Sequence, residues 1–163
     1  MRKALIVILI CCAVPVAAQA NDVKVFSATN CQPTASSSNY LYELGAILNT
    51  NTNFSRLTVF CPVTRDSTGE PGWDTIEIFV RDASTSQNFD CRAEILHADG
   101  HTTRGNANET QDYSSSTGVQ TLSFSTPSDN GDVGSWAVYG FNCTMPDSTD
   151  TNRSAIFGYK IEE

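Results

Sequence analysis

Apolar and polar residues alternate along several short segments of this chain, and this spacing constrains the fold more than any other feature. In the segment 74–80, Ile76, Ile78 and Val80 share one face, and the residues between them share the other. A period of two residues is that of a β-strand with one buried face. Strands are expected on this basis at residues 23–28, 40–48, 57–61, 74–80, 89–97, 119–125, 136–143 and 155–161.

About eight short strands with polar connections, and no convincing helical stripe, predict an all-β fold. We expect an antiparallel β-sandwich, similar to a jelly roll, in one domain over residues 21–163. A helical turn is the alternative for residues 41–48, although Gly45 makes a helix there less favourable. Pro62 is expected to end its strand at Cys61, because proline has no N–H to donate to a neighbouring strand.

The first twenty residues have the pattern of a cleavable secretory signal. Arg2 and Lys3 precede an apolar run over 4–14, and Ala18-Gln19-Ala20 matches a cleavage site. The run is too short to span about 30 Å of hydrocarbon, and no later window is apolar enough to do so. We therefore expect a soluble mature chain, without a membrane span, that is secreted, periplasmic or at the cell surface.

The mature chain is expected to be strongly acidic. Removing Arg2 and Lys3 leaves eight basic residues against 18 acidic ones, a net charge of −10. This charge disfavours nucleic acid, whose phosphates need a basic surface, and it equally disfavours anionic membranes. Solubility outside the cell is the simplest interpretation of the acidity.

Four cysteines remain in the mature chain, and their even number predicts two disulfides in an exported domain. Metal binding by thiolates needs close pairs, and the spacings of 30, 30 and 52 residues supply none. Four cysteines allow three pairings. We favour Cys31–Cys61 with Cys91–Cys143, because each bridge joins a chain segment to a predicted strand.

The segment 104–118 is polar and has no apolar periodicity, so it is expected to be a long loop. Loops of this length are commonly either functional or disordered. We favour disorder over a functional loop.

Two groups of residues are candidates for binding a metal ion. His97 and His101 flank the hairpin signal Asp99-Gly100, and a three-residue loop places them opposite each other, whereas a two-residue loop places them on opposite faces. Asp129 and Asp132 offer carboxylate oxygens for Ca²⁺, although they lack the ligand spacing of a calcium loop. We favour an exposed hairpin tip and a solvated turn, with no cofactor, and Ca²⁺ is the alternative.

Trp73 stands at a junction between a loop and a strand, where an exposed ring stacks well on the apolar C–H face of a sugar. A platform of Trp73 with Tyr113 or Tyr40 is the best candidate for a glycan-binding site. The alternative, which is the commoner arrangement, is a tryptophan folded over the edge of the sheet.

Catalytic motifs are scarce. The sequence has no G-x-S-x-G element and only two histidines, both in one predicted hairpin. Eighteen acidic residues make some carboxylate pair inevitable by chance. No catalytic residues are assigned, and whether the chain is an enzyme stays open at this point.

The cysteine layout resembles a group of small bacterial secreted proteins that have two disulfides and no assigned function. The residues that carry the resemblance are Cys31, Asn49, Cys61-Pro62-Val63, Asp82, Cys91, Cys143 and Pro146. The resemblance implies export and the disulfide-bonded fold, and it implies no site residues.

Three functions follow from these expectations, in decreasing order of preference. The first is a secreted, non-catalytic β-sandwich that binds an extracellular ligand, a glycan or a protein. The second is a structural or self-associating cell-surface protein that uses exposed strand edges. The third is an extracellular hydrolase.

Overall fold

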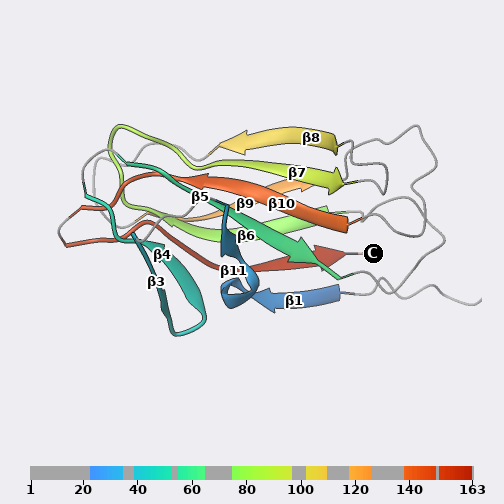
Figure 1. The fold of residues 1–163 in the computed structure, drawn as a ribbon, viewed down its shortest axis with the longest axis horizontal. Coiled ribbons are helices and arrows are strands. Elements are labelled where there is room, and N and C mark those ends of the chain that lie inside the picture. The colour runs from blue at the N-terminus through green and yellow to red at the C-terminus, as the bar shows by residue number, and fades with distance from the viewer. Residues whose placement is uncertain are drawn as a thin grey trace, which may run out of the picture.

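Strands that are far apart in the sequence lie side by side in the computed structural model, where they build two antiparallel sheets that face each other (Figure 1). The structure describes residues 23–34, 39–52, 55–64, 75–96, 102–109, 118–125, 138–149 and 151–162. The predicted all-β sandwich is therefore confirmed. The predicted signal, residues 1–20, lies outside the described residues and stays a prediction.

Six strands form the first sheet, in the order β3-β4-β11-β6-β9, with β1 also paired to β11. They are β1 (Val23–Ser27), β3 (Tyr40–Glu43), β4 (Ala46–Asn49), β6 (Thr75–Asp82), β9 (Gly118–Ser125) and β11 (Ala155–Glu162). Five strands form the second sheet, in the order β2-β5-β10-β7-β8. They are β2 (Gln32–Pro33), β5 (Leu57–Val63), β7 (Asp90–Leu96), β8 (Thr102–Glu109) and β10 (Val138–Met145).

Most connections in the described chain pass from one sheet to the other, as they do in jelly rolls. The hairpins β3–β4 and β7–β8 join neighbours within one sheet. A short 3-10 helix, η1 (Ala28–Asn30), follows β1. Within the described ranges, no helix has the length and apolarity needed to cross a bilayer.

The predicted strand 40–48 is wrong in one respect, because it divides into β3 and β4. Leu44 has φ 49° and Gly45 has φ 87°, so both residues of the connection are left-handed. Two such residues make the tight turn that matches the twist of a hairpin. A strand period of two residues does not reveal the turn, because leucine rarely adopts this conformation.

Pro62 does not end its strand, contrary to the prediction, since β5 continues to Val63. On one side of β5, β2 pairs only with Val59 and Phe60. Pro62 lies beyond that pairing, and on its other side it stands opposite Gly140 of β10. A missing N–H is tolerated where a strand has a neighbour on one side only.

The expected loop 104–118 is also partly wrong, because residues 102–109 form β8. This strand is at the edge of its sheet and pairs with β7, from Asp90↔Glu109 to Leu96↔Thr102. Backbone pairing along an edge needs no apolar alternation, which is why the polar sequence did not reveal it. The two added strands β2 and β8, with the divided 40–48, give eleven strands in the described residues.

The favoured disulfide pairing, Cys31–Cys61 and Cys91–Cys143, is confirmed. Cys91 and Cys143 stand directly opposite each other on β7 and β10. All four cysteines are buried in the core. Disulfides persist in oxidising compartments, as expected of an exported chain.

Among the residues that the structure describes, Tyr159 of β11 is the largest fully buried side chain, and it lies between the two sheets. Its ring stacks on Phe26 of the first sheet at a centroid distance of 5.0 Å. It meets Phe141 of the second sheet edge-on at 4.9 Å. Its hydroxyl donates a hydrogen bond of 2.6 Å to the carbonyl oxygen of Pro62. The same side chain therefore provides both apolar packing and a polar link between the sheets.

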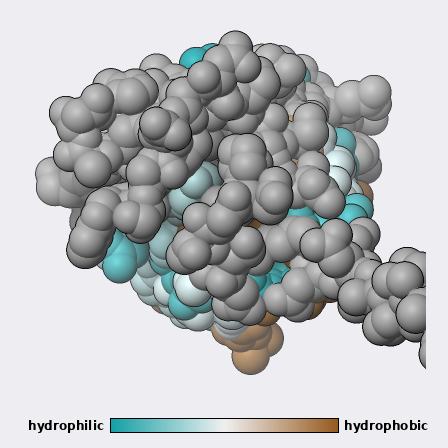
Figure 2. Space-filling view, turned by 90° about the vertical axis from the view of Figure 1, so that its right-hand side faces the viewer, coloured by the Kyte–Doolittle hydropathy of each residue, from teal (hydrophilic) through white to brown (hydrophobic). Residues whose placement is uncertain are grey.

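The β3–β4 hairpin projects from the sandwich (Figure 1). Figure 2 shows a hydrophobic projection at the lower edge of the molecule, at the height where Figure 1 places this hairpin. Leu44, at the tip, is fully exposed. The turn of the hairpin is held by the Ser27 hydroxyl, which donates to the carbonyl oxygen of Gly45 at 2.8 Å.

Replacing Leu44 with Asn is expected to raise the free energy of unfolding by about 1 kcal/mol, because asparagine tolerates a left-handed backbone better than leucine. The exposed leucine side chain loses no packing in this exchange. Urea unfolding measures the difference. Leu44→Val, which is β-branched, is expected to lower stability at the same position. An Asn variant that is less stable than the parent contradicts the turn geometry.

Tyr159 also makes the free energy of unfolding depend on pH in the alkaline range. Burial raises its pKa from the ordinary value of 10.0 to about 12, because the charged phenolate is poorly solvated there. The unfolded chain therefore ionises first, so the stabilisation is fully present below pH 10 and is lost as the pH rises toward 12.

We expect the unfolding free energy to fall more steeply between pH 10 and 12 in the parent chain than in Tyr159→Phe. Urea unfolding at a series of pH values tests this. The Phe variant is expected to lose about 1 kcal/mol at neutral pH, since the Pro62 carbonyl loses its donor. Parallel pH curves for the two proteins would show that Tyr159 is not the group responsible.

Candidate functional site

Polar side chains are buried at one end of the sandwich, where the connections before β5, before β7 and before β11 come together (the left-hand end in Figure 1). The group contains two carboxylates, one amide and three hydroxyls. Its members are Asn49, Asp82, Ser84, Asp147, Ser148 and Ser154, and each is at most 8% exposed. Buried polar groups need hydrogen-bond partners, so their partners show what this cluster holds together.

Asn49, at the end of β4, is fully buried and bonds three separate segments. Its Nδ2 donates to the carbonyl oxygens of Ser55 at 3.1 Å and Pro146 at 2.7 Å. Its Oδ1 accepts from the backbone N–H of Asn51 at 3.0 Å. One side chain thus fixes the approach to β5 and the exit from β10.

Two serines extend the cluster to the connection between β6 and β7. The Ser148 hydroxyl accepts from the Ser154 N–H at 2.9 Å and donates to the Asn49 carbonyl oxygen at 2.5 Å. The Ser154 hydroxyl donates to the Asp147 carbonyl oxygen at 2.8 Å and accepts from the Ala83 N–H at 3.1 Å. The segments around residues 50, 83 and 148 are therefore tied to one another by buried hydrogen bonds.

The connection 83–89 also has internal turns. The Asp82 carboxylate accepts from the Ser84 N–H at 3.0 Å. The Ser84 hydroxyl accepts from the N–H groups of Ser86 at 3.3 Å and Gln87 at 3.1 Å. Short polar side chains that bond their own backbone hold a loop in one conformation. Its exposed side chains are therefore presented from a fixed backbone.

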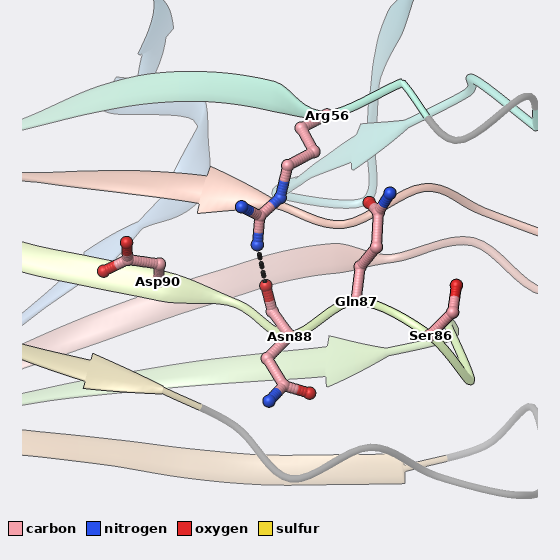
Figure 3. A pocket seen from close by; sticks show the side chains of 5 residues that line it. All are labelled: Arg56, Ser86, Gln87, Asn88 and Asp90. Atoms are coloured by element: carbon pink, nitrogen blue, oxygen red, sulfur yellow. Dashed lines mark hydrogen bonds between the residues drawn. The ribbon is translucent and has the colours of Figure 1, made fainter.

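A hollow of about 300 Å³ lies beside this loop. Five polar side chains line it: Arg56, Ser86, Gln87, Asn88 and Asp90 (Figure 3). The Arg56 guanidinium donates a hydrogen bond of 2.6 Å to the Asn88 carbonyl oxygen, while the Asn88 side chain points away from it (Figure 3). Asp90 forms an ion pair of 3.5 Å with Arg92. The residues that line the hollow thus comprise one cation, one anion, two amides and one hydroxyl.

A second hollow, of about 290 Å³, adjoins the first because Ser86 lines both. Hydroxyl groups dominate its lining, which consists of Thr52, Ser84, Thr85, Ser86, Asp147, Ser148 and Thr149. Hydroxyl and amide groups both donate and accept hydrogen bonds. The residues that line the two hollows therefore include both hydrogen-bond donors and acceptors for a polar, uncharged ligand.

Of the predicted site residues, only Tyr40 is among the described ones. It is half-buried, packs against the core and meets Tyr42 edge-on at 5.6 Å. It pairs with Asn49, so it lies at the same end of the sandwich as the buried polar cluster. The other candidates lie outside the described residues, and their roles stay predictions: Trp73, Tyr113, His97, His101, Asp129 and Asp132. Within the described ranges, no group of three or more His, Cys, Asp or Glu side chains can hold a metal ion.

Sequence reasoning missed Arg56, Gln87 and Asn88. One signal was present, namely the run of short polar residues at 84–88 that directly follows a strongly alternating strand. Such runs are frequent in loops of every kind, so the signal does not distinguish a binding loop from a simple connection.

No protein-family model and no curated protein matches the sequence. Solved structures to which this chain is similar include CsCBM6-3 from Clostridium stercorarium in complex with cellobiose. Its TM-score is 0.48, with 10% identity over 85% of this chain and 92% of that chain. Another is CBM86, a low-affinity xylan-binding module from Roseburia intestinalis, with a TM-score of 0.44 and 14% identity over 87% of this chain and 95% of that one. A carbohydrate-binding module of family 29 has a TM-score of 0.36 and 9% identity over 86% and 89% of the two chains. These likenesses assign the chain to no family.

Replacing Asn49 with Ala is expected to lower the free energy of unfolding by about 3 kcal/mol, because the buried carbonyl groups of Ser55 and Pro146 lose their donor. Thermal and urea unfolding measure the loss. Thr52→Ala, at an exposed position in the following loop, is the control and is expected to change stability by less than about 0.5 kcal/mol. Equal stability of the two variants would contradict a structural role for the buried cluster.

Proposed function

We propose that this chain is a secreted, non-catalytic glycan-binding β-sandwich, and that a sugar binds across the two hollows that share Ser86. The observation that carries the proposal is the combination of these polar hollows with the buried cluster beneath them. Loops on a rigid scaffold are the usual location of binding residues in such folds.

The chemistry of the lining suits sugar hydroxyls, each of which donates one hydrogen bond and accepts others. Arg56 supplies donors, Asp90 supplies acceptors, and Gln87 and Ser86 supply both. Each hollow, at about 300 and 290 Å³, lies near the lower limit of small-molecule sites, roughly 300–1,000 Å³. One sugar unit per hollow is therefore the expected occupancy.

Rigidity supports the same proposal. The loop 83–89 is held by its own turns and by the Ser154 hydroxyl, so ordering it on binding costs little conformational entropy. In this proposal Trp73, with Tyr113 or Tyr40, remains the predicted aromatic platform that adds stacking to these hydrogen bonds.

The test is a binding screen of the oxidised chain against soluble polysaccharides, by affinity electrophoresis and then calorimetry. Arg56→Ala and Gln87→Ala are each expected to weaken binding about tenfold, because each removes hydrogen bonds to sugar hydroxyls. Leu44→Asn, at the distant hairpin tip, is the matched control and is expected to bind as the parent does.

Two results would count against this site. Unchanged affinity in both hollow variants would show that the glycan binds elsewhere, and absence of binding to every polysaccharide would overturn the glycan-binding function. Repeating the binding measurement with EDTA tests whether a metal ion is needed. Loss of binding in EDTA would indicate a metal-dependent site, for which His97, His101, Asp129 and Asp132 are the predicted ligands.

A further inference from the structure

The outer face of the six-stranded sheet carries most of the large apolar side chains that are exposed in the described chain. Strand register and burial place them on the side of the sheet opposite the core. Leu41, Val119 and Phe157 are 42%, 68% and 39% exposed, and Val25 is 73% exposed. Charged residues lie between some of these side chains, because Val25 pairs with Lys160 and Val119 pairs with Arg81. The part of the face that suits a ligand is therefore the arrangement around Phe157.

Phe157 reaches this face through a β-bulge. The register of β11 against β6 shifts between Ile156 and Gly158. Ile156 and Tyr159 point into the core, and Phe157, at the extra residue, is exposed on the other side. Bulges commonly redirect a side chain next to a functional site.

Arg81 of β6 is held beside this ring. Its Nε donates a hydrogen bond of 2.8 Å to the carbonyl oxygen of Arg153, and its Cζ lies 5.7 Å from the centroid of Phe157. Its two Nη groups make no hydrogen bond to any other residue that the structure describes. The guanidinium is therefore fixed at its base and offers its Nη donors next to an exposed aromatic ring.

Charged groups lie on the same face, one step along the strands. Lys160 of β11 pairs with Glu77 of β6 at 3.5 Å and with Glu162 at 2.5 Å. Packing this face against a second copy of the chain would remove these ions and Arg81 from water, which is costly. A sugar chain covers the ring with its apolar C–H face and leaves the charged groups partly hydrated, so it fits this surface better.

We propose that the outer face of the six-stranded sheet is a second carbohydrate-binding surface, where Phe157 stacks on a sugar ring and the Arg81 Nη groups donate to its hydroxyls. The proposal rests on the proposed glycan-binding function for its ligand class. The surface is separate from the two hollows, since none of the residues named for it lines either of them.

Two sites on one chain predict a dependence on ligand length. A polysaccharide that reaches both sites binds more tightly than either site alone, whereas a short oligosaccharide occupies them independently. Loss of one site therefore lowers the apparent affinity for the polymer more than the affinity for the oligomer.

The experiment compares the full chain with Phe157→Ala, Phe157→Leu, Phe157→Trp, Arg81→Gln and Arg56→Ala on xylan, cellulose and mannan, and on their tetrasaccharides. Phe157→Ala and Arg81→Gln are each expected to weaken polymer binding about tenfold. Phe157→Leu keeps an apolar side chain without the aromatic ring and is expected to weaken binding similarly, whereas Phe157→Trp is expected to keep it. Circular dichroism and thermal unfolding establish that each variant is folded.

The outcomes separate the two proposals. Parental binding by the Ala, Leu and Gln face variants, with loss in Arg56→Ala, would overturn the second surface and leave the proposed function standing. Loss in the face variants with parental binding in Arg56→Ala would support this surface and reject the hollows. Loss in both classes supports two sites, and no binding by the parent chain to any of the glycans would overturn both proposals.

Discussion

The packing of Tyr159 between the two sheets is the contact on which the rest of the structure depends. β11 has neighbours on both edges, so its inward side chains occupy the middle of the core. The Tyr159 ring contacts Phe26 on its own sheet and Phe141 on the other, and its hydroxyl bonds Pro62 across the sandwich. Apolar packing alone does not set how two sheets align, and a directional hydrogen bond adds that constraint.

The middle of the sandwich and the end near Asn49 are stabilised in different ways. The middle of the sandwich excludes water with apolar side chains, whereas the end near Asn49 is built from buried polar groups. Such groups stabilise a structure only when their hydrogen bonds are made, and the bonds of Asn49, Ser148 and Ser154 go to loop backbone. The buried cluster therefore holds the connections before β5, β7 and β11 together, and the two polar hollows lie on the surface that these connections form.

On the outer face of the six-stranded sheet, exposed side chains are likewise held in place by the backbone around them. Phe157 is exposed because the bulge breaks the alternation of β11, and Gly158 follows because a Cβ there would come within 2.6 Å of the Phe26 carbonyl oxygen. Arg81 belongs to a regular strand, yet the Arg153 carbonyl fixes its guanidinium. Local irregularity and a long-range hydrogen bond together create this surface.

The sequence by itself determined the fold class and most of the strands, because burial on one face of a strand leaves a period of two residues that needs no tertiary information. It favoured one of the three possible disulfide pairings, and the tertiary structure decided for that one. It did not determine the turn at Leu44, the continuation through Pro62 or the polar edge strand 102–109, since neighbouring strands decide each of them. Of the predicted binding and metal residues, only Tyr40 is among the described ones, and it lines neither hollow. Arg56, Gln87 and Phe157 take up the positions on which their proposed roles rest when distant segments meet, and only the tertiary structure decides which segments those are.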